Sequence, residues 1–134
     1  MDPTRPSQLS VNVRLLDDQH TVLIAHIERL EQAMTAAQSA DAIPKIIRDL
    51  EDYAGYHLPT EERLMVSYGY LLRDVHTIEH QKFLTRLREI ERMVAEGHVT
   101  AAVQLLGRLR GWLDRHVMEW DAKLGDFLNT CGVA

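Results

Sequence analysis

Cysteine is almost absent from this chain of 134 residues. The one cysteine, Cys131, cannot form an internal disulfide, and we expect a reducing cytoplasm as the location. Basic residues are also in the minority, with 15 Lys and Arg against 20 Asp and Glu. The net charge of -5 argues against nucleic acid as a partner, because phosphate backbones attract clustered basic side chains. No apolar run approaches the roughly 20 residues that span a bilayer, so no membrane partner is expected.

Length and composition predict one globular domain. A chain of this length can bury its own core, and 46% of its residues are hydrophobic. The start, MDPTRPSQ, is polar and contains two prolines, which argues against both a helix and a signal peptide. We therefore expect an extended N-terminal arm over residues 1–17 and a helical domain over residues 18–134.

Helical periodicity dominates the domain, and no alternating strand pattern occurs. The first helix is expected to begin near Asp17 or Asp18, either of which could cap it. From there a set of mostly apolar residues recurs at helical spacing: Val22, Leu23, His26, Ile27, Leu30 and Met34. The second is expected from Asp41 to the turn SYGYL, the third from about 71 to 96 with Gly97 as its C-terminal cap, and the fourth from about 100 to 128. Short loops between long helices predict an all-α, up-down-up-down antiparallel four-helix bundle.

Five histidines and two acidic residues fall near one end of this bundle. The first and third helices start at the end where the second and fourth finish, so residues distant in sequence converge there. They are His20, His57, Glu61, His76, His80, His116 and Asp121. Nitrogen-rich ligation with some oxygen suits a first-row transition metal such as iron, zinc or copper better than magnesium or calcium. Seven ligands are too many for one ion and suit two.

The spacing of these residues predicts two helix irregularities. His116 and Asp121 are five residues apart, which on a regular α-helix turns them about 140° from one another. We therefore expect a π-type widening between them, as often occurs at functional sites. Pro59 lies between His57 and Glu61, and its ring should kink the helix there.

The same residues carry a resemblance to a known family. The motifs DDQH at 17–20, HLPTEE at 57–62, GY at 69–70 followed by H-x3-H at 76–80, and WLDRHVMEWD at 112–121 all occur in order. The chain resembles the hemerythrin family, and within it the single-domain bacteriohemerythrins, from about Leu9 to the C-terminal KLGDFLNTCG. The resemblance implies a hemerythrin-like four-helix bundle with a non-haem di-iron centre that binds O2 reversibly.

The resemblance also implies a division of the ligands between two Fe ions. His76, His80 and His116 would hold one iron, and His20 and His57 the other. Glu61 and Asp121 would bridge the two irons together with an oxo or hydroxo group. The first iron is then saturated, whereas the second keeps one open coordination position, as a reactive metal site requires. With fewer carboxylates than ferritin-like sites, such a centre is expected to bind O2 as peroxide rather than cleave it.

An O2 pocket beside the open position must exclude water. Trp112 and Leu113 precede His116 by about one helical turn, and in the family the corresponding positions line the pocket. We expect Trp112, Leu113, Leu58 and Val117 to form this lining. The sequence departs from the family at Leu58, where phenylalanine is usual, and it lacks the tryptophan often found in the N-terminal arm. Both departures leave the ligands untouched.

Other chemically active side chains are expected to be ordinary. His26 and His98 are expected not to bind metal, and Glu62 is expected to be a solvated or salt-bridged surface group. Cys131 is expected to be inert, although a redox role is conceivable. Five further aromatic residues are expected to be core or rim groups: Tyr53, Tyr56, Phe83, Trp120 and Phe127.

These features predict a cytoplasmic oxygen-binding protein, a carrier, store or supplier of O2, rather than an enzyme. One alternative is an oxygen or redox sensor acting on a signalling partner. Another is a di-iron peroxidase or nitric-oxide-handling enzyme, against which stands the lack of an obvious general acid. An oxygen-consuming enzyme is the other expected partner, and the chain is expected to be a monomer or weak oligomer.

Overall fold

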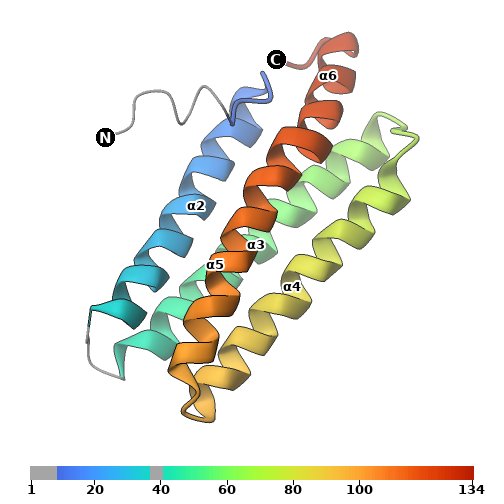
Figure 1. Cartoon of the computed structure of the whole chain (residues 1–134). Coiled ribbons are helices and arrows are strands. Elements are labelled where there is room, and N and C mark those ends of the chain that lie inside the picture. Colours follow the sequence, from blue (N-terminus) through green and yellow to red (C-terminus); the bar gives the residue numbers. More distant parts are fainter. Residues whose placement is uncertain (1–8, 37–40) are drawn as a thin grey trace.

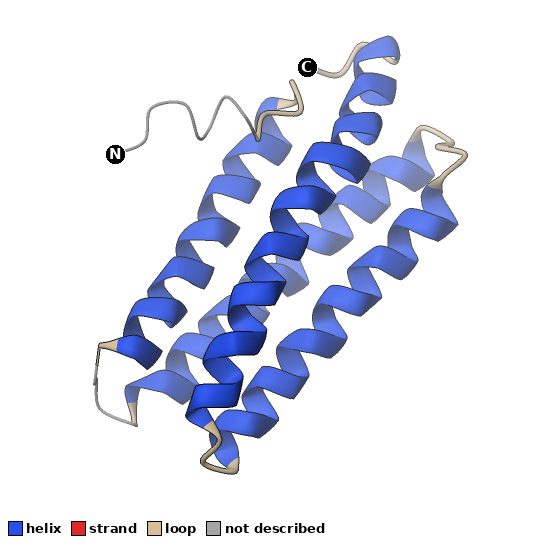
Figure 2. Cartoon of the chain, viewed as in Figure 1, coloured by secondary structure: helices blue, strands red, loops and turns tan. Residues whose placement is uncertain are grey.

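Four long helical segments pack along a common axis (Figure 1). A computed structural model describes residues 9–36 and 41–134 of the chain. The segments are α2, Arg14–Thr35; α3, Ala42–Ser67; α4, Arg73–Ala95; and a last one composed of α5, Val99–His116, the π-helix η1, Val117–Asp121, and α6, Ala122–Thr130. Within the described ranges the only regular structure is helical, and Figure 2 shows no strand there. The predicted all-α class is confirmed.

The helices are connected up-down-up-down. Helix α2 packs against α3 and α5, and α4 packs against the same two helices. The start of α2, the turn between α3 and α4 and the end of α6 all lie at one end of the bundle (Figure 1). This arrangement brings the beginnings of α2 and α4 beside the later turns of α3 and the last segment.

The bundle axis is filled with aliphatic residues and one phenylalanine. Fully buried side chains come from all four segments: Leu23, Ile27, Leu30, Ile47, Leu50, Phe83, Leu87, Ile90, Leu106 and Leu109. Burying one such side chain contributes about 1.5–3 kcal/mol, so this stripe stabilises the bundle independently of its polar end. Val22, which recurs at helical spacing with these residues in the first helix, is 40% exposed.

The first helix begins three residues earlier than the sequence suggested. Its first turn is closed by a hydrogen bond from the backbone N–H of Asp17 to the carbonyl of Val13, so neither Asp17 nor Asp18 is the N-cap. The carboxylate of Asp17 instead accepts hydrogen bonds from the hydroxyl of Ser10 and the backbone N–H of Val11. Val11 and Val13 are buried in the core. The end of the expected arm therefore packs onto the bundle, while residues 1–8 lie outside the described part.

The remaining boundaries follow the expected signals closely. Helix α3 starts directly after Asp41, and α4 ends two residues before Gly97. Gly69 and Gly97 have φ values of 69° and 83°, in the left-handed region that glycine adopts readily. Pro59 lies inside α3, which continues to Ser67, and a kink at Pro59 stays a prediction.

Among the described residues, no helix combines the length and the apolar character needed to cross a bilayer.

Candidate metal centre

Seven polar side chains meet inside one end of the bundle. His20 comes from the second turn of α2, His57 and Glu61 from α3, His76 and His80 from the first turns of α4, His116 from the end of α5 and Asp121 from the end of η1. All seven are at most 4% exposed to solvent. Ionisable side chains are rarely buried to this extent unless they are paired or bind a metal.

The carboxylate of Glu61 stands between two groups of imidazoles. Its Oε2 atom lies 3.0 Å from Nε2 of His57 and 3.0 Å from Nε2 of His20. Its Oε1 atom lies 3.0 Å from Nε2 of His80 and 3.3 Å from Nε2 of His76. The i,i+4 spacing in α3 aims His57 and Glu61 along one helix face, which makes this contact possible.

Asp121 divides its oxygens in the same way. Its Oδ2 atom lies 3.1 Å from Nε2 of His20, and its Oδ1 atom lies 2.9 Å from Nε2 of His76 and 3.1 Å from Nε2 of His116. The π-helix η1 covers residues 117–121, as the five-residue spacing predicted. Its wider turn places residues five apart on the same side, so His116 and Asp121 face each other.

The centre thus contains two sets of imidazoles with a shared pair of carboxylates. We call His20 and His57 the two-histidine set, and His76, His80 and His116 the three-histidine set. Each carboxylate presents one oxygen to each set. Potential ligand atoms of the three-histidine set, Glu61 and Asp121 all lie within 4.8 Å of one another, as do those of His20, His57 and Glu61. Both groups can therefore hold a metal ion.

Several buried atoms of this centre have no hydrogen-bond partner among the described residues. They include Oδ1 of Asp121 and the Nε2 atoms of His76 and His116, although these two nitrogens lie only 2.9 Å and 3.1 Å from that oxygen. The atoms are close together but not oriented for hydrogen bonds, and unpaired buried polar atoms are costly. A cation coordinated by them would satisfy them, so the donor set fits a metal such as iron.

In the metal-free centre, the carboxylates and histidines stabilise one another in their charged forms. Burial opposes protonation of His20, but hydrogen bonds with Asp121 and Glu61 outweigh it and raise the pKa of His20 to about 10. Burial likewise opposes protonation of His80, and its contacts with Glu61 and Glu62 raise its pKa to about 9. Burial would raise the pKa of Glu61, but the neighbouring histidines hold it well below its usual value. Two buried carboxylates therefore attract positive charge, whether protons or metal ions.

Two further polar residues, which the sequence analysis missed as site residues, contact the outer nitrogens of the imidazoles. His57 donates from Nδ1 to Oε1 of Gln19 at 2.7 Å, and His80 donates from Nδ1 to Oε2 of Glu62 at 2.8 Å. Glu62 was expected to be solvated or salt-bridged at the surface. It is partly exposed, but its partner is a residue of the centre. Gln19 adjoins His20 in sequence and Glu62 adjoins Glu61, but this adjacency does not predict a contact with an imidazole on another helix.

The four residues expected to line an O2 pocket are buried or half-buried. Leu58, Leu113 and Val117 are buried, and Trp112 is half-buried. The ring of Trp112 stacks on the imidazole of His116, with centroids 4.9 Å apart. Trp120, expected to be a core or rim aromatic, is half-buried and meets His76 edge-on with centroids 5.9 Å apart. A role for these side chains toward a ligand stays a prediction.

The remaining histidines lie apart from the centre. The ring of His26 packs against Tyr53, with centroids 5.4 Å apart, and His98 lies 3.9 Å from the carboxylate of Glu96. Neither belongs to the groups that can hold a metal. Cys131 is exposed near the end of the last helical segment.

Comparisons with known proteins agree with this geometry. The family model described as the hemerythrin HHE cation binding domain matches residues 11–128. A bacteriohemerythrin of Stenotrophomonas maltophilia is 29% identical over 118 residues, covering 88% of this chain and 76% of that protein. A bacteriohemerythrin of Methylococcus capsulatus is 24% identical over 124 residues, covering 92% of this chain and 94% of that protein.

A solved structure also matches. A wild-type hemerythrin crystal structure aligns with a TM-score of 0.78 and 26% identity, covering 88% of this chain and 90% of that one. The match of the family model spans every residue of both imidazole sets and both shared carboxylates. The chain therefore belongs to the hemerythrin family.

Proposed function

We propose that this protein binds O2 reversibly at a pair of iron ions held by the seven buried side chains. The three-histidine set would hold one iron, and the two-histidine set the other. Glu61 and Asp121 would bridge them. The observation that carries the proposal is the division of both carboxylates, each with one oxygen toward each imidazole set. That arrangement is what two ions sharing two ligands require.

The unequal numbers of imidazoles suggest where O2 would enter. With the same bridges on both sides, the position of the two-histidine set has one protein ligand fewer. An open coordination position distinguishes a reactive metal site from a structural one. Iron at such a position supplies reversible binding of O2. His20 and His57 would hold this iron, while the chain around it keeps water out.

Apolar and aromatic side chains supply the exclusion of water in this proposal. Leu58 follows His57 directly, Leu113 and Val117 flank His116, and all three are buried. Trp112 covers one face of the His116 ring. A dry surrounding would slow the entry of protons and solvent, which promote departure of the ligand in a reduced form and leave oxidised, inactive iron. Leu58 would form a smaller wall than the phenylalanine usual in the family.

The relatives support an oxygen-binding role, since two of them carry the name bacteriohemerythrin. We propose a carrier, storage or delivery function in the cytoplasm, with O2 as ligand and an oxygen-consuming enzyme as recipient. A sensor that acts through a signalling partner is the second candidate. The observation that favours it is Glu62, a partly exposed residue in contact with a residue of the centre, through which the surface could respond to the metals.

The test is spectroscopic. The metal-free protein is loaded with ferrous iron under argon, assayed for two irons per chain, and exposed to air. The proposal expects a visible charge-transfer band that appears with O2 and disappears on deoxygenation over repeated cycles. A chain that binds two irons but gives an irreversible change would exclude the carrier. Sustained turnover of hydrogen peroxide or nitric oxide by the same sample would favour an enzyme instead.

A further inference from the structure

The two imidazole sets differ in what their outer nitrogens contact. In the described part of the chain, one imidazole of each set donates from Nδ1 to a side chain. His57 of the two-histidine set donates to the amide oxygen of Gln19, and His80 of the three-histidine set donates to the carboxylate of Glu62. The Nδ1 atoms of the other three, His20, His76 and His116, have no partner among the described residues.

The two acceptors are unlike in charge. An amide is neutral, whereas a carboxylate makes a charge-assisted hydrogen bond of about twice the strength. A carboxylate on the outer nitrogen also makes the imidazole a stronger base and hence a stronger metal donor. His80 is therefore the better electron donor of the two, and it belongs to the set that already has more imidazoles.

The acceptors also differ in their surroundings. Gln19 is only 3% exposed, so its contact with His57 is sealed within the bundle. The side chain of Glu62 is 34% exposed and lines a surface groove together with Pro59, Arg63 and Val66. A negative charge at Glu62 thus keeps part of its hydration, whereas the same charge at position 19 would be buried.

We propose that Gln19 and Glu62 are positioning residues that make the two metal positions electronically unequal. Glu62 fixes the His80 ring and strengthens it as a donor, which favours the higher oxidation state at the three-histidine position. Gln19 fixes the His57 ring without adding charge, which keeps the two-histidine position easier to reduce. The inference rests on the proposed function, because it assigns both sets to redox-active ions.

The first measurement isolates positioning. Metal-free protein is titrated with Co²⁺ alone, under argon, for the native chain, Glu62→Gln and Glu62→Ala. Loss of an outer partner typically lowers metal affinity by about 10–100-fold, so Glu62→Ala should weaken one of two bound ions to that extent. Glu62→Gln should lose much less, because its amide oxygen still accepts the His80 hydrogen bond. If Glu62→Ala binds both ions with native affinity, the positioning role is wrong.

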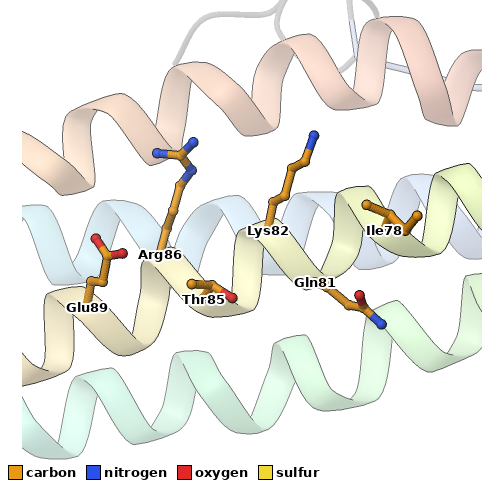
Figure 3. A pocket seen from close by; sticks show the side chains of 6 residues that line it. All are labelled: Ile78, Gln81, Lys82, Thr85, Arg86 and Glu89. Carbon is orange, nitrogen blue, oxygen red and sulfur yellow. The ribbon is translucent and has the colours of Figure 1, made fainter.

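A matched surface variant controls for the change in net charge. Figure 3 shows Glu89 on α4, the helix that carries His80, beside a shallow groove that Arg86 and Lys82 also line. Glu89 is nine residues beyond His80, or about 13 Å along the helix axis. Glu89→Gln removes the same charge as Glu62→Gln and should leave Co²⁺ affinity unchanged. An equal effect of the two variants would reduce the role of Glu62 to general electrostatics and overturn the proposal.

The second measurement isolates charge. Reduction potentials of the iron-loaded proteins are determined by anaerobic redox titration. Glu62→Gln should shift the potential to more positive values, since the hydrogen bond remains but the negative charge is lost. Gln19→Glu, the mirror change, should shift it to more negative values. Of the two variants, Glu62→Gln decides whether the inference stands. Position 62 is partly exposed and the two side chains have nearly the same shape, so the substitution changes the charge with little effect on packing. An unchanged or more negative potential for Glu62→Gln overturns the inference.

Both measurements exclude O2, so they separate the inference from the proposed function. A native protein that holds two irons but fails to bind O2 reversibly contradicts the proposed function alone. Native potentials in Glu62→Gln, with reversible O2 binding intact, contradict the inference alone.

Discussion

The indole ring of Trp112 lies nearly flat against the imidazole of His116, with centroids 4.9 Å apart and an angle of 17° between the planes. The Nε2 atom of the same imidazole lies 3.1 Å from Oδ1 of Asp121. The i,i+4 spacing on α5 allows the stack, and aromatic pairs prefer such offset arrangements. Trp112 therefore both orients a residue of the centre and covers it.

We predict that Trp112→Ala shortens the working life of the iron-loaded protein more than Trp112→Phe does. The stack contributes about 0.5–1.5 kcal/mol beyond area burial, and phenylalanine keeps part of it and of the cover. The number of oxygenation cycles before the reversible band is lost measures the effect. Tyr56→Ala is the control, because this aromatic residue is 53% exposed. Equal lifetimes for native protein and Trp112→Ala would remove Trp112 from the water-excluding wall.

Glu61→Gln is predicted to abolish binding of at least one of two metal ions. Glu61 presents Oε2 to His20 and His57 and Oε1 to His76 and His80. A glutamine has the same shape but carries one NH2 group, which cannot ligate a cation, so one side loses its ligand. The number of Zn²⁺ ions bound per chain measures this.

The control for Glu61→Gln is Asp49→Asn, a surface change at a carboxylate that contacts Arg29 and Lys45. The control should bind as much Zn²⁺ as the native chain. Two tightly bound Zn²⁺ ions in Glu61→Gln would show that Glu61 is not shared between them.

The bundle and its polar end could be predicted from sequence because both depend on periodic spacing. Leu23, Ile27 and Leu30 recur at helical intervals, and the same period aims His57 and Glu61 along one face. The π-helix was predictable for the complementary reason, since a spacing of five residues between His116 and Asp121 is incompatible with a regular α-helix. The up-down connectivity then predicted that these residues, although distant in sequence, meet at one end of the bundle.

Contacts that depend on side-chain reach between helices were not predictable. Glu62 and Gln19 lie next to His80 and His57 only because α3 packs beside α4 and α2 at a particular rotation. The predicted start of α2 was also wrong, because aspartate is a common N-cap residue, which makes Asp17 a candidate cap. Here its carboxylate binds Ser10 and the Val11 backbone instead, which ties the preceding segment to the helix.

A third prediction concerns the packing of residues 9–13 on α6. A methyl group added at Gly125 of α6 would collide with the backbone oxygen of Val11, whereas one added at Gly107 of α5 meets no atom within 4 Å. Gly125→Ala should therefore lower the free energy of unfolding by about 1–3 kcal/mol, the usual cost of overpacking. Gly107→Ala should raise it by about 0.4–1 kcal/mol, because alanine restricts the unfolded chain.

Urea unfolding of the two metal-free alanine variants measures both changes. The pair shares one chemical change, so the difference between them reports the contact with Val11. Equal stabilities would show that residues 9–13 do not pack on α6 in solution.

The metal-free protein should lose stability as the pH rises above neutral. Burial lowers the pKa of His20, but hydrogen bonds with Asp121 and Glu61 outweigh it and raise the pKa from 6.5 to about 10. A group with a raised pKa stabilises the folded state fully below its unfolded value and loses that contribution through its folded value. Thermal melting temperatures should therefore fall between pH 6.5 and about pH 10.

Two comparisons separate this cause from general alkaline denaturation. His20→Gln should flatten the decline without removing it, because His80 also has a raised pKa, of about 9. His98→Gln, at an exposed position beside Glu96, should leave the decline as it is. Zn²⁺-loaded protein should lack the decline, since coordinated imidazoles are already neutral and do not lose a proton as the pH rises through this range. A metal-free melting temperature that stays constant over this range would mean that the carboxylates do not hold protons on the histidines.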